Sequence, residues 1–223
     1  AAESTFMFTP SATAIDSITS GDNEFRMCFT DPAQGTKSAQ YIGEHKLATK
    51  VAVLYDSMAD YNSGVHDAFV SACGDYGLEV VADEAYTTDN NTDFSVQLGK
   101  IKDSGAELLF LPNYYSDNAL ILQQAHDLGL DMKIFGVDGM DGILNVENFD
   151  KSLAEGVMLL TPFSATATDE KSQNFVKAYG DAHNGEIPNQ FAADTYDVLY
   201  AMQLAADDAK ITPDMENADI SAA

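Results

Sequence analysis

The sequence has no tryptophan, only two cysteines and few basic residues, and each scarcity argues against a class of protein. Its 223 residues include 11 Lys and Arg against 36 Asp and Glu, which gives a formal net charge of −25. Binding to nucleic acid or to anionic lipid requires a basic patch, so neither partner is expected. The acidity is interpreted as a solvated surface in a salty or external medium. A field that attracts cationic ligands is the weaker interpretation, because exposed charges are screened over about 10 Å.

Long apolar runs and metal-binding clusters are also missing. No stretch approaches the roughly 18 to 20 uncharged apolar residues of a membrane span, and no N-terminal segment has the pattern of a secretion signal. Cys28 and Cys73 lie in apolar stretches and are interpreted as small buried side chains. There is no CxxC motif and no cluster of His and Cys, so we expect no zinc site and no cofactor. Because an apolar run begins only a few residues in, we expect that the true N-terminus lies upstream.

Short apolar runs alternate with amphipathic helical windows along most of the chain. The runs cover residues 49–56, 78–86, 106–112, 133–138 and 156–163, and the windows between them carry apolar residues at helical spacing. In one window, Phe94, Val96, Leu98 and Ile101 are expected to form the inner face of a helix. This alternation predicts an α/β fold with a mainly parallel sheet that is covered on both faces.

The pattern changes after residue 163. Two long helical windows follow, residues 168–185 and 189–210, with no strand expected between them. From residue 211 to residue 223 the signal fades into an acidic tail, which we interpret as a truncated or frayed end.

Ligands of open α/β sheets bind beyond the carboxyl ends of the strands, and four loops there carry unusual residues. The first is residues 9–14, where Ser11 and Thr13 precede an expected helix. Free N–H groups at such a start suit a carboxylate or a phosphate, and the alternative is an ordinary helix cap. Two further loops carry Tyr61 and the pair Tyr114 and Tyr115. These tyrosines either pack half-buried or form an aromatic wall with polar tips.

The fourth loop follows the strand at residues 133–138 and contains Asp138 and Gly139. With no side chain at Gly139, the Asp138 carboxylate could approach an ammonium group closely; the alternative is a helix cap. An anion-binding loop, a cation-binding carboxylate and aromatic walls together suit a zwitterion, which predicts an α-amino acid as the ligand.

An enzyme is the main alternative of a different class. Nucleophilic catalysis requires a base beside a nucleophile, and none of the four histidines lies on these loops. The stretch GVDGMDG lacks the GxGxxG spacing of a dinucleotide-binding protein. Asp138 and Asp141 could act as an acid–base pair, but Asp141 is interpreted as a first-turn helix residue. We therefore expect a binding protein and not an enzyme.

Several motifs in series resemble one known family. They are FTPSATAIDSIT, FRMCFTDPAQGTKSAQYI, KVAVLYDSMADYNSGVHDAF and TDFSVQLGKIKDSGAELLFLPNYYSDNALILQQAHDLGL, followed by IFGVDG. Over roughly residues 5–206 the chain is similar to the branched-chain amino acid (Leu/Ile/Val)-binding proteins. These are type I periplasmic solute-binding proteins of ABC transporters.

The resemblance implies two Rossmann-like α/β lobes that are joined by crossover strands and close on a ligand like a hinge. By this comparison, residues 1–31 are part of lobe one, residues 32–160 form a complete lobe two, and residues 161–223 return to lobe one. Family members have βα units before the TPSAT loop and strands after the region where this chain ends. The chain is therefore expected to be a fragment of the family's full length, with lobe one partial.

The resemblance also assigns site residues. The family's carboxylate-binding loop matches Ser11, Ala12 and Thr13, its first lobe-two aromatic matches Tyr61, and its strand-end tyrosine matches Tyr114 or Tyr115. Its acidic ligand for the α-ammonium matches Asp138, beside Gly139, where the Leu/Ile/Val receptors often carry the longer Glu.

For the whole protein, the resemblance implies a monomer outside the cytoplasm, either periplasmic or lipid-anchored. It would capture a branched-chain or similar amino acid and present it to an ABC transporter permease. The alternative is the ligand-sensing domain of a receptor or regulator that binds an amide or another small polar solute.

Overall fold

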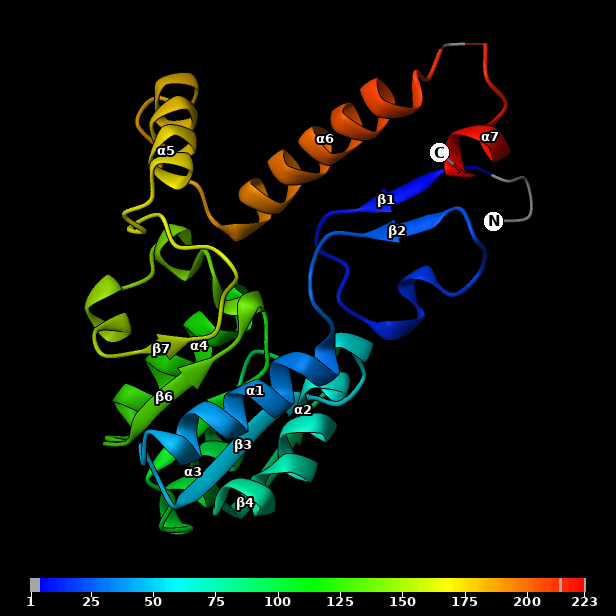
Figure 1. Cartoon of the computed structure of the whole chain (residues 1–223). Helices are drawn as coiled ribbons and strands as arrows, with labels where there is room; N and C mark the ends of the chain where they lie inside the picture. The colour runs from blue at the N-terminus through cyan, green and yellow to red at the C-terminus, as the bar shows by residue number, and fades with distance from the viewer. Residues whose placement is uncertain (1–4, 213, 223) are drawn as a thin grey trace. The chain divides into compact units, whose positions relative to one another are not determined.

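The computed structural model describes residues 5–212 and 214–222 (Figure 1). The chain forms two compact units. One is the continuous segment Asp31–Thr161, and the other comprises the described residues of Ala1–Thr30 and Pro162–Ala223.

The Asp31–Thr161 unit is built around a five-stranded sheet in the order β4-β3-β5-β6-β7, in which every pairing is parallel. The strands are β3 (Lys50–Asp56), β4 (Glu79–Tyr86), β5 (Leu108–Leu111), β6 (Lys133–Gly136) and β7 (Met158–Leu159). The α-helices are α1 (Asp31–Glu44), α2 (Asp60–Cys73), α3 (Ser95–Asp103) and α4 (Tyr115–Asp127). The predicted α/β class with a parallel sheet is confirmed.

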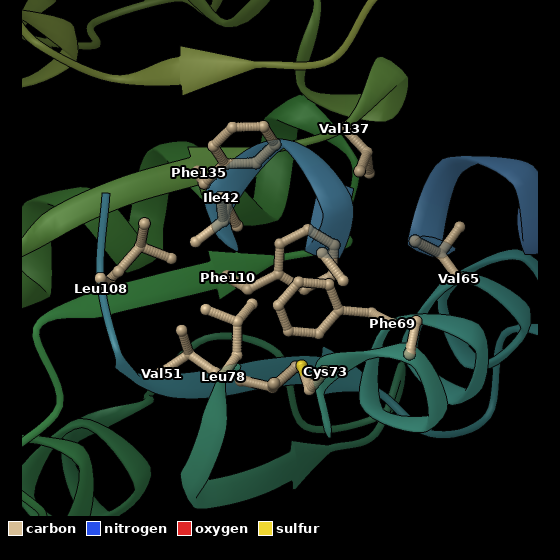
Figure 2. Close-up of a cluster of buried hydrophobic side chains, with 14 of the residues drawn as sticks. Ile42, Val51, Val65, Phe69, Cys73, Leu78, Leu108, Phe110, Phe135 and Val137 are labelled. Carbon is tan, nitrogen blue, oxygen red and sulfur yellow. The ribbon is translucent and has the colours of Figure 1, made fainter. Parts of the chain in front are cut away.

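Alternate residues of the central strands face two separate apolar clusters. Val51, Val53 and Phe110 point toward α1 and α2, whereas Ala52 and Leu54 point toward α3 and α4. Figure 2 shows the first cluster, where the rings of Phe69 and Phe110 stack with centroids 3.8 Å apart. Both faces of the central strands β3 and β5 are therefore buried, which explains why these strands are nearly continuous apolar runs in the sequence.

The expected inner face of α3 was wrong at one position. Phe94, Leu98 and Ile101 are fully buried, but the side chain of Val96 is 68% exposed. Positions 94, 98 and 101 are spaced by four and three residues and share one helix face, and position 96 lies on the other side.

The end of the unit after β6 is more irregular than the sequence suggests. Between β6 and β7 the described chain forms no α-helix but three short 3₁₀ helices, η3 (Asp138–Met140), η4 (Ile143–Asn145) and η5 (Lys151–Ala154). The expected strand at residues 156–163 is only the two-residue β7. Gly77, Gly105 and Gly129, which follow helices of this unit, adopt the left-handed conformation typical of helix ends, with φ of 72°, 76° and 66°.

The second unit contains a small parallel pair of strands and three helices. β1 (Met7–Thr9) pairs with β2 (Glu24–Arg26), and the 3₁₀ helix η1 (Ile15–Ile18) lies in the connection between them. The helices are α5 (Glu170–Ala182), α6 (Gln190–Ala209) and α7 (Asn217–Ala222), so both predicted helical windows are confirmed. Even the 20-residue α6 carries several aspartates, and no helix among the described residues combines the length and apolarity needed to cross a bilayer.

Candidate functional site: a fixed carboxylate at the end of the sheet

Asp138 lies at the carboxyl end of the sheet, two residues beyond the last residue of β6. β3, β5 and β6 are neighbours in the sheet, so the loops that follow them meet at one edge. The Asp138 residue is 4% exposed, although it is charged and follows a short strand. Burying a carboxylate is costly unless polar partners hold it, so the residues around Asp138 define the candidate site.

The hydroxyl of Tyr61 bridges Asp138 to the next peptide. It donates a hydrogen bond to Asp138 Oδ1 at 2.5 Å and accepts one from the Gly139 N–H at 2.9 Å. Burial, followed by the charge of Asp138, raises the pKa of Tyr61 well above its ordinary value, so the phenol stays protonated and remains a donor. A Cβ at position 139 would lie 2.7 Å from the Tyr61 hydroxyl oxygen, which explains the glycine there.

Helix α1 supplies a further contact that sequence reasoning missed. The Asp138 N–H donates to Gln34 Oε1 at 3.3 Å, and Gln34 is fully buried. Asp31 begins the same helix, is also buried, and approaches the backbone of α2, since a Cβ at Gly64 would lie 3.1 Å from its carboxylate. The spacing of Asp31 and Gln34 could have indicated this contact, because residues three positions apart lie on the same face of a helix.

Tyr114 packs against Tyr61. Its ring centroid lies 4.8 Å from that of Tyr61, and the residue is 45% exposed, so one side of the ring faces solvent. Burial, followed by the charges of Asp138 and Asp31, raises the pKa of Tyr114. Tyr115 begins α4 and is exposed. Of the two tyrosines that the sequence left open, the geometry favours Tyr114.

A buried amide holds the loops of β3 and β5 together. Asn113 Nδ2 donates to the Leu54 carbonyl at 2.8 Å, and Asn113 Oδ1 accepts from the Asp56 N–H and from Asn62 Nδ2. Because Asn62 follows Tyr61, and Asn113 precedes Tyr114, this side chain links the segments that carry the two tyrosines. In the sequence, the only sign of this contact is an amide side chain at the end of a strand.

The expected carboxylate loop lies in the other unit, between β1 and η1. Ser11 Oγ donates to Asp194 Oδ2 at 3.0 Å, and the Ala12 N–H donates to Thr9 Oγ1 at 3.1 Å. Thr13 is buried. Arg26 Nη1 donates to the carbonyls of residues 12, 13 and 14, a contact that the sequence did not reveal.

The polar groups around Asp138 can bind a ligand through charge and hydrogen bonds. Among residues 5–212 and 214–222, no group of three or more His, Cys, Asp or Glu side chains could hold a metal ion. His66, on α2, is buried and hydrogen-bonded within the protein. Its ring nitrogens lie 2.8 Å and 2.9 Å from carboxylate oxygens of Asp67 and Asp83.

A family model described as periplasmic binding protein matches residues 1–222. The chain belongs to this periplasmic binding protein family. It is 34% identical over 135 residues to Leu/Ile/Val-binding protein homolog 3 of Brucella melitensis, and 28% identical over 178 residues to the leucine-, isoleucine-, valine-, threonine- and alanine-binding protein of Pseudomonas aeruginosa. These alignments cover 60% and 79% of this chain but only 36% and 47% of those proteins, so the chain spans less than half of their length.

Solved structures of periplasmic binding proteins show the same fold. The branched-chain amino acid substrate-binding protein LivJ of Streptococcus pneumoniae, in complex with isoleucine, is 27% identical with a TM-score of 0.81. The alignment covers 98% of this chain and 60% of LivJ. The closed conformation of a leucine-, isoleucine-, valine-, threonine- and alanine-binding protein from Brucella ovis gives a TM-score of 0.83 over 97% of this chain at 20% identity. The type I periplasmic binding protein fold inferred from the sequence is thus confirmed.

Replacing Tyr61 by Phe tests the bridge to Asp138. The variant keeps the ring against Tyr114 but leaves the Asp138 carboxylate and the Gly139 N–H without the hydroxyl. Removing a buried hydrogen-bonding partner costs about 1–3 kcal/mol, so we expect the free energy of unfolding measured by urea denaturation to fall by about that amount. Tyr115→Phe, at an exposed tyrosine, is the matched control and should change the free energy of unfolding by less than about 0.5 kcal/mol; an equal loss in both variants would contradict a role for the Tyr61 hydroxyl.

Proposed function

We propose that the protein is the solute-binding component of an ABC importer and captures a small amino acid outside the cytoplasm. The observation that carries the proposal is the Asp138 carboxylate, buried and held by Tyr61 at 2.5 Å beside the Tyr114 ring. A carboxylate that is already oriented loses little freedom when an ammonium group arrives, so more of the charge-assisted hydrogen bond appears as affinity.

The charge of the surrounding loops favours an amine. Residues 56–62, 87–94, 112–118 and 137–147 follow strands of one sheet, and they contain several aspartates but no Lys or Arg. A ligand group that binds at this edge should therefore be cationic or neutral. We assign the ligand carboxylate to the loop of Ser11, Ala12 and Thr13, as the resemblance implies, and the aromatic wall to Tyr61 and Tyr114.

The relatives agree with an amino acid ligand. LivJ was solved with isoleucine, and the names of the curated relatives specify leucine, isoleucine and valine. Other proteins of the same fold were solved with benzoate or 3,4-dihydroxybenzoic acid, at 17% and 19% identity. These ligands have no ammonium group, which makes them useful probes of the role of Asp138.

The proposal extends to the setting of the whole protein. We propose that it acts as a monomer, periplasmic or lipid-anchored, and presents its ligand to a transporter permease. We also propose that residues 32–160 form a complete lobe, and that residues 1–31 and 161–223 belong to a second lobe which this chain contains only in part.

A thermal-shift screen tests the proposed function. The protein is heated alone and with L-leucine, L-isoleucine, L-valine, L-threonine, L-alanine, leucinamide or benzoate. A ligand that binds only the native state at 100 times its Kd adds about 2.7 kcal/mol of stability. We expect the unfolding temperature to rise with at least one of the amino acids. A rise with benzoate alone, or with none of the amino acids, would overturn the assignment.

A further inference from the structure

Arg26 makes an unusual contact with the expected carboxylate loop. It is the single arginine of the sequence, lies at the end of β2, and pairs across the strands with Thr9, from which the loop departs. Its Nη1 lies 3.1 Å, 2.8 Å and 2.7 Å from the carbonyl oxygens of Ala12, Thr13 and Ala14. One guanidinium nitrogen therefore gathers three consecutive carbonyls on one side of the loop.

This contact determines which way the peptide N–H groups of the loop point. The described chain has no cis peptide bond, and in a trans peptide the C=O and the following N–H point in opposite directions. Since the carbonyls of residues 12–14 face Arg26, the N–H groups of Thr13, Ala14 and Ile15 face away from it. Within the described residues, none of these three N–H groups donates a hydrogen bond to the protein. They are thus available to an acceptor outside the loop.

The guanidinium also removes an electrostatic obstacle to anion binding. A loop whose carbonyl oxygens turned toward an incoming carboxylate would repel it. Held by Arg26, the oxygens are instead neutralised by a fixed positive charge, and the partial positive charges of the N–H groups are left on the opposite side. Successive N–H groups on one side of a turn are a recurring way to bind an anion.

We propose that Arg26 is a positioning residue for the carboxylate of the ligand. It acts through the backbone of Ala12–Ala14, which it holds with the N–H groups directed toward the ligand, and it does not itself contact the ligand. This inference rests on the proposed function, because it takes the loop of Ser11, Ala12 and Thr13 as the carboxylate-binding element.

Two ligands that differ only in the carboxylate separate positioning from a general structural effect. The variant Arg26→Gln is compared with the wild-type protein for binding L-leucine and L-leucinamide, which keeps the ammonium group and the side chain but has no negative charge. We expect L-leucine to bind at least about tenfold more weakly, and L-leucinamide to change by less than about threefold. Arg26→Lys keeps the charge but reaches fewer carbonyls, so its affinity for L-leucine should be intermediate.

Hydrogen exchange gives a second readout, which also decides the matter if L-leucinamide binds too weakly to titrate. In the wild-type protein, L-leucine should slow the exchange of the Thr13, Ala14 and Ile15 amides, and in Arg26→Lys and Arg26→Gln this protection should be reduced. Lys171→Gln, an exposed cation of the same unit, is the charge-matched control and should leave both the affinity and the protection unchanged.

The outcomes separate this inference from the function on which it rests. A wild-type protein that binds no amino acid would overturn the proposed function and the role of Arg26 with it. Binding of L-leucine that survives in Arg26→Gln with intact protection of residues 13–15 would overturn the role of Arg26 alone. Equal losses for L-leucine and L-leucinamide would show that Arg26 only supports the fold. If Arg26→Gln does not fold, the comparison is made with Arg26→Lys.

Discussion

Replacing Asp138 by Asn is expected to weaken the binding of L-leucine by at least about 100-fold, or about 2.7 kcal/mol. The amide has almost the shape of the carboxylate and can still accept a hydrogen bond from Tyr61, so the local packing is kept. What it loses is the negative charge that we propose lies opposite the ligand's ammonium group. Truncating one partner of a buried, hydrogen-bonded charge pair costs about 2–5 kcal/mol, because the other charge is left buried without compensation. Isothermal titration calorimetry at pH 7 measures the change.

The control for this experiment is Asp89→Asn. Asp89 also follows a strand of the same sheet, but it is exposed on the loop after β4. The change in net charge is identical, and screening by water and salt should keep its effect on affinity below about twofold. If Asp138→Asn binds L-leucine within about threefold of wild type, Asp138 does not bind the ammonium group. The buried carboxylate of Asp31 would then be the next group to replace.

The architecture of the Asp31–Thr161 unit was predictable because its signals are local. A parallel strand buried on both faces is an apolar run, and residues 49–56 and 106–112 show this without knowledge of their neighbours. Carboxyl ends of adjacent strands meet at one edge of the sheet, so Asp138, Tyr61 and the pair Tyr114 and Tyr115 could be predicted to lie close together. The prediction for Val96 failed because apolar residues alternate with polar ones around it, and this alternation was interpreted as one face of a helix.

The supporting residues could not be predicted because their partners are distant in the sequence. Gln34 is separated from Asp138 by 104 residues, and Asn113 is separated from Leu54 by 59. In the sequence each is a polar residue in or beside a helical window, where a solvent-exposed position is the usual outcome. Arg26 is only 12 to 14 residues from its carbonyl partners, but backbone acceptors leave no side-chain pattern to detect.

One packing contact decides whether α1 can bring Gln34 to Asp138. Helices α1 and α2 cross at Gly35, where a Cβ would lie 2.4 Å from the Val65 carbonyl oxygen and 2.6 Å from the Phe69 nitrogen. Both are backbone atoms of a helix and have no rotamer that would relieve the clash. Gly35 therefore permits an approach between the two helices that no other residue allows, and the burial of Gln34 one position before it depends on that approach.

Replacing Gly35 by Ala is accordingly expected to lower the free energy of unfolding by about 2–3 kcal/mol, in the upper part of the range for overpacked cores. Gly99 of α3 is the matched control: it is also helical, and a Cβ there meets nothing within 4 Å. Gly99→Ala should raise stability by about 0.5–1 kcal/mol, because alanine loses less backbone entropy in a helix. Urea denaturation measures both changes.

Since moving α1 also moves Gln34 away from the Asp138 N–H, Gly35→Ala should weaken L-leucine binding as well, whereas Gly99→Ala should not. Similar gains in stability for the two variants would show that the helices can separate freely, and Gln34 could then not be holding Asp138 in place.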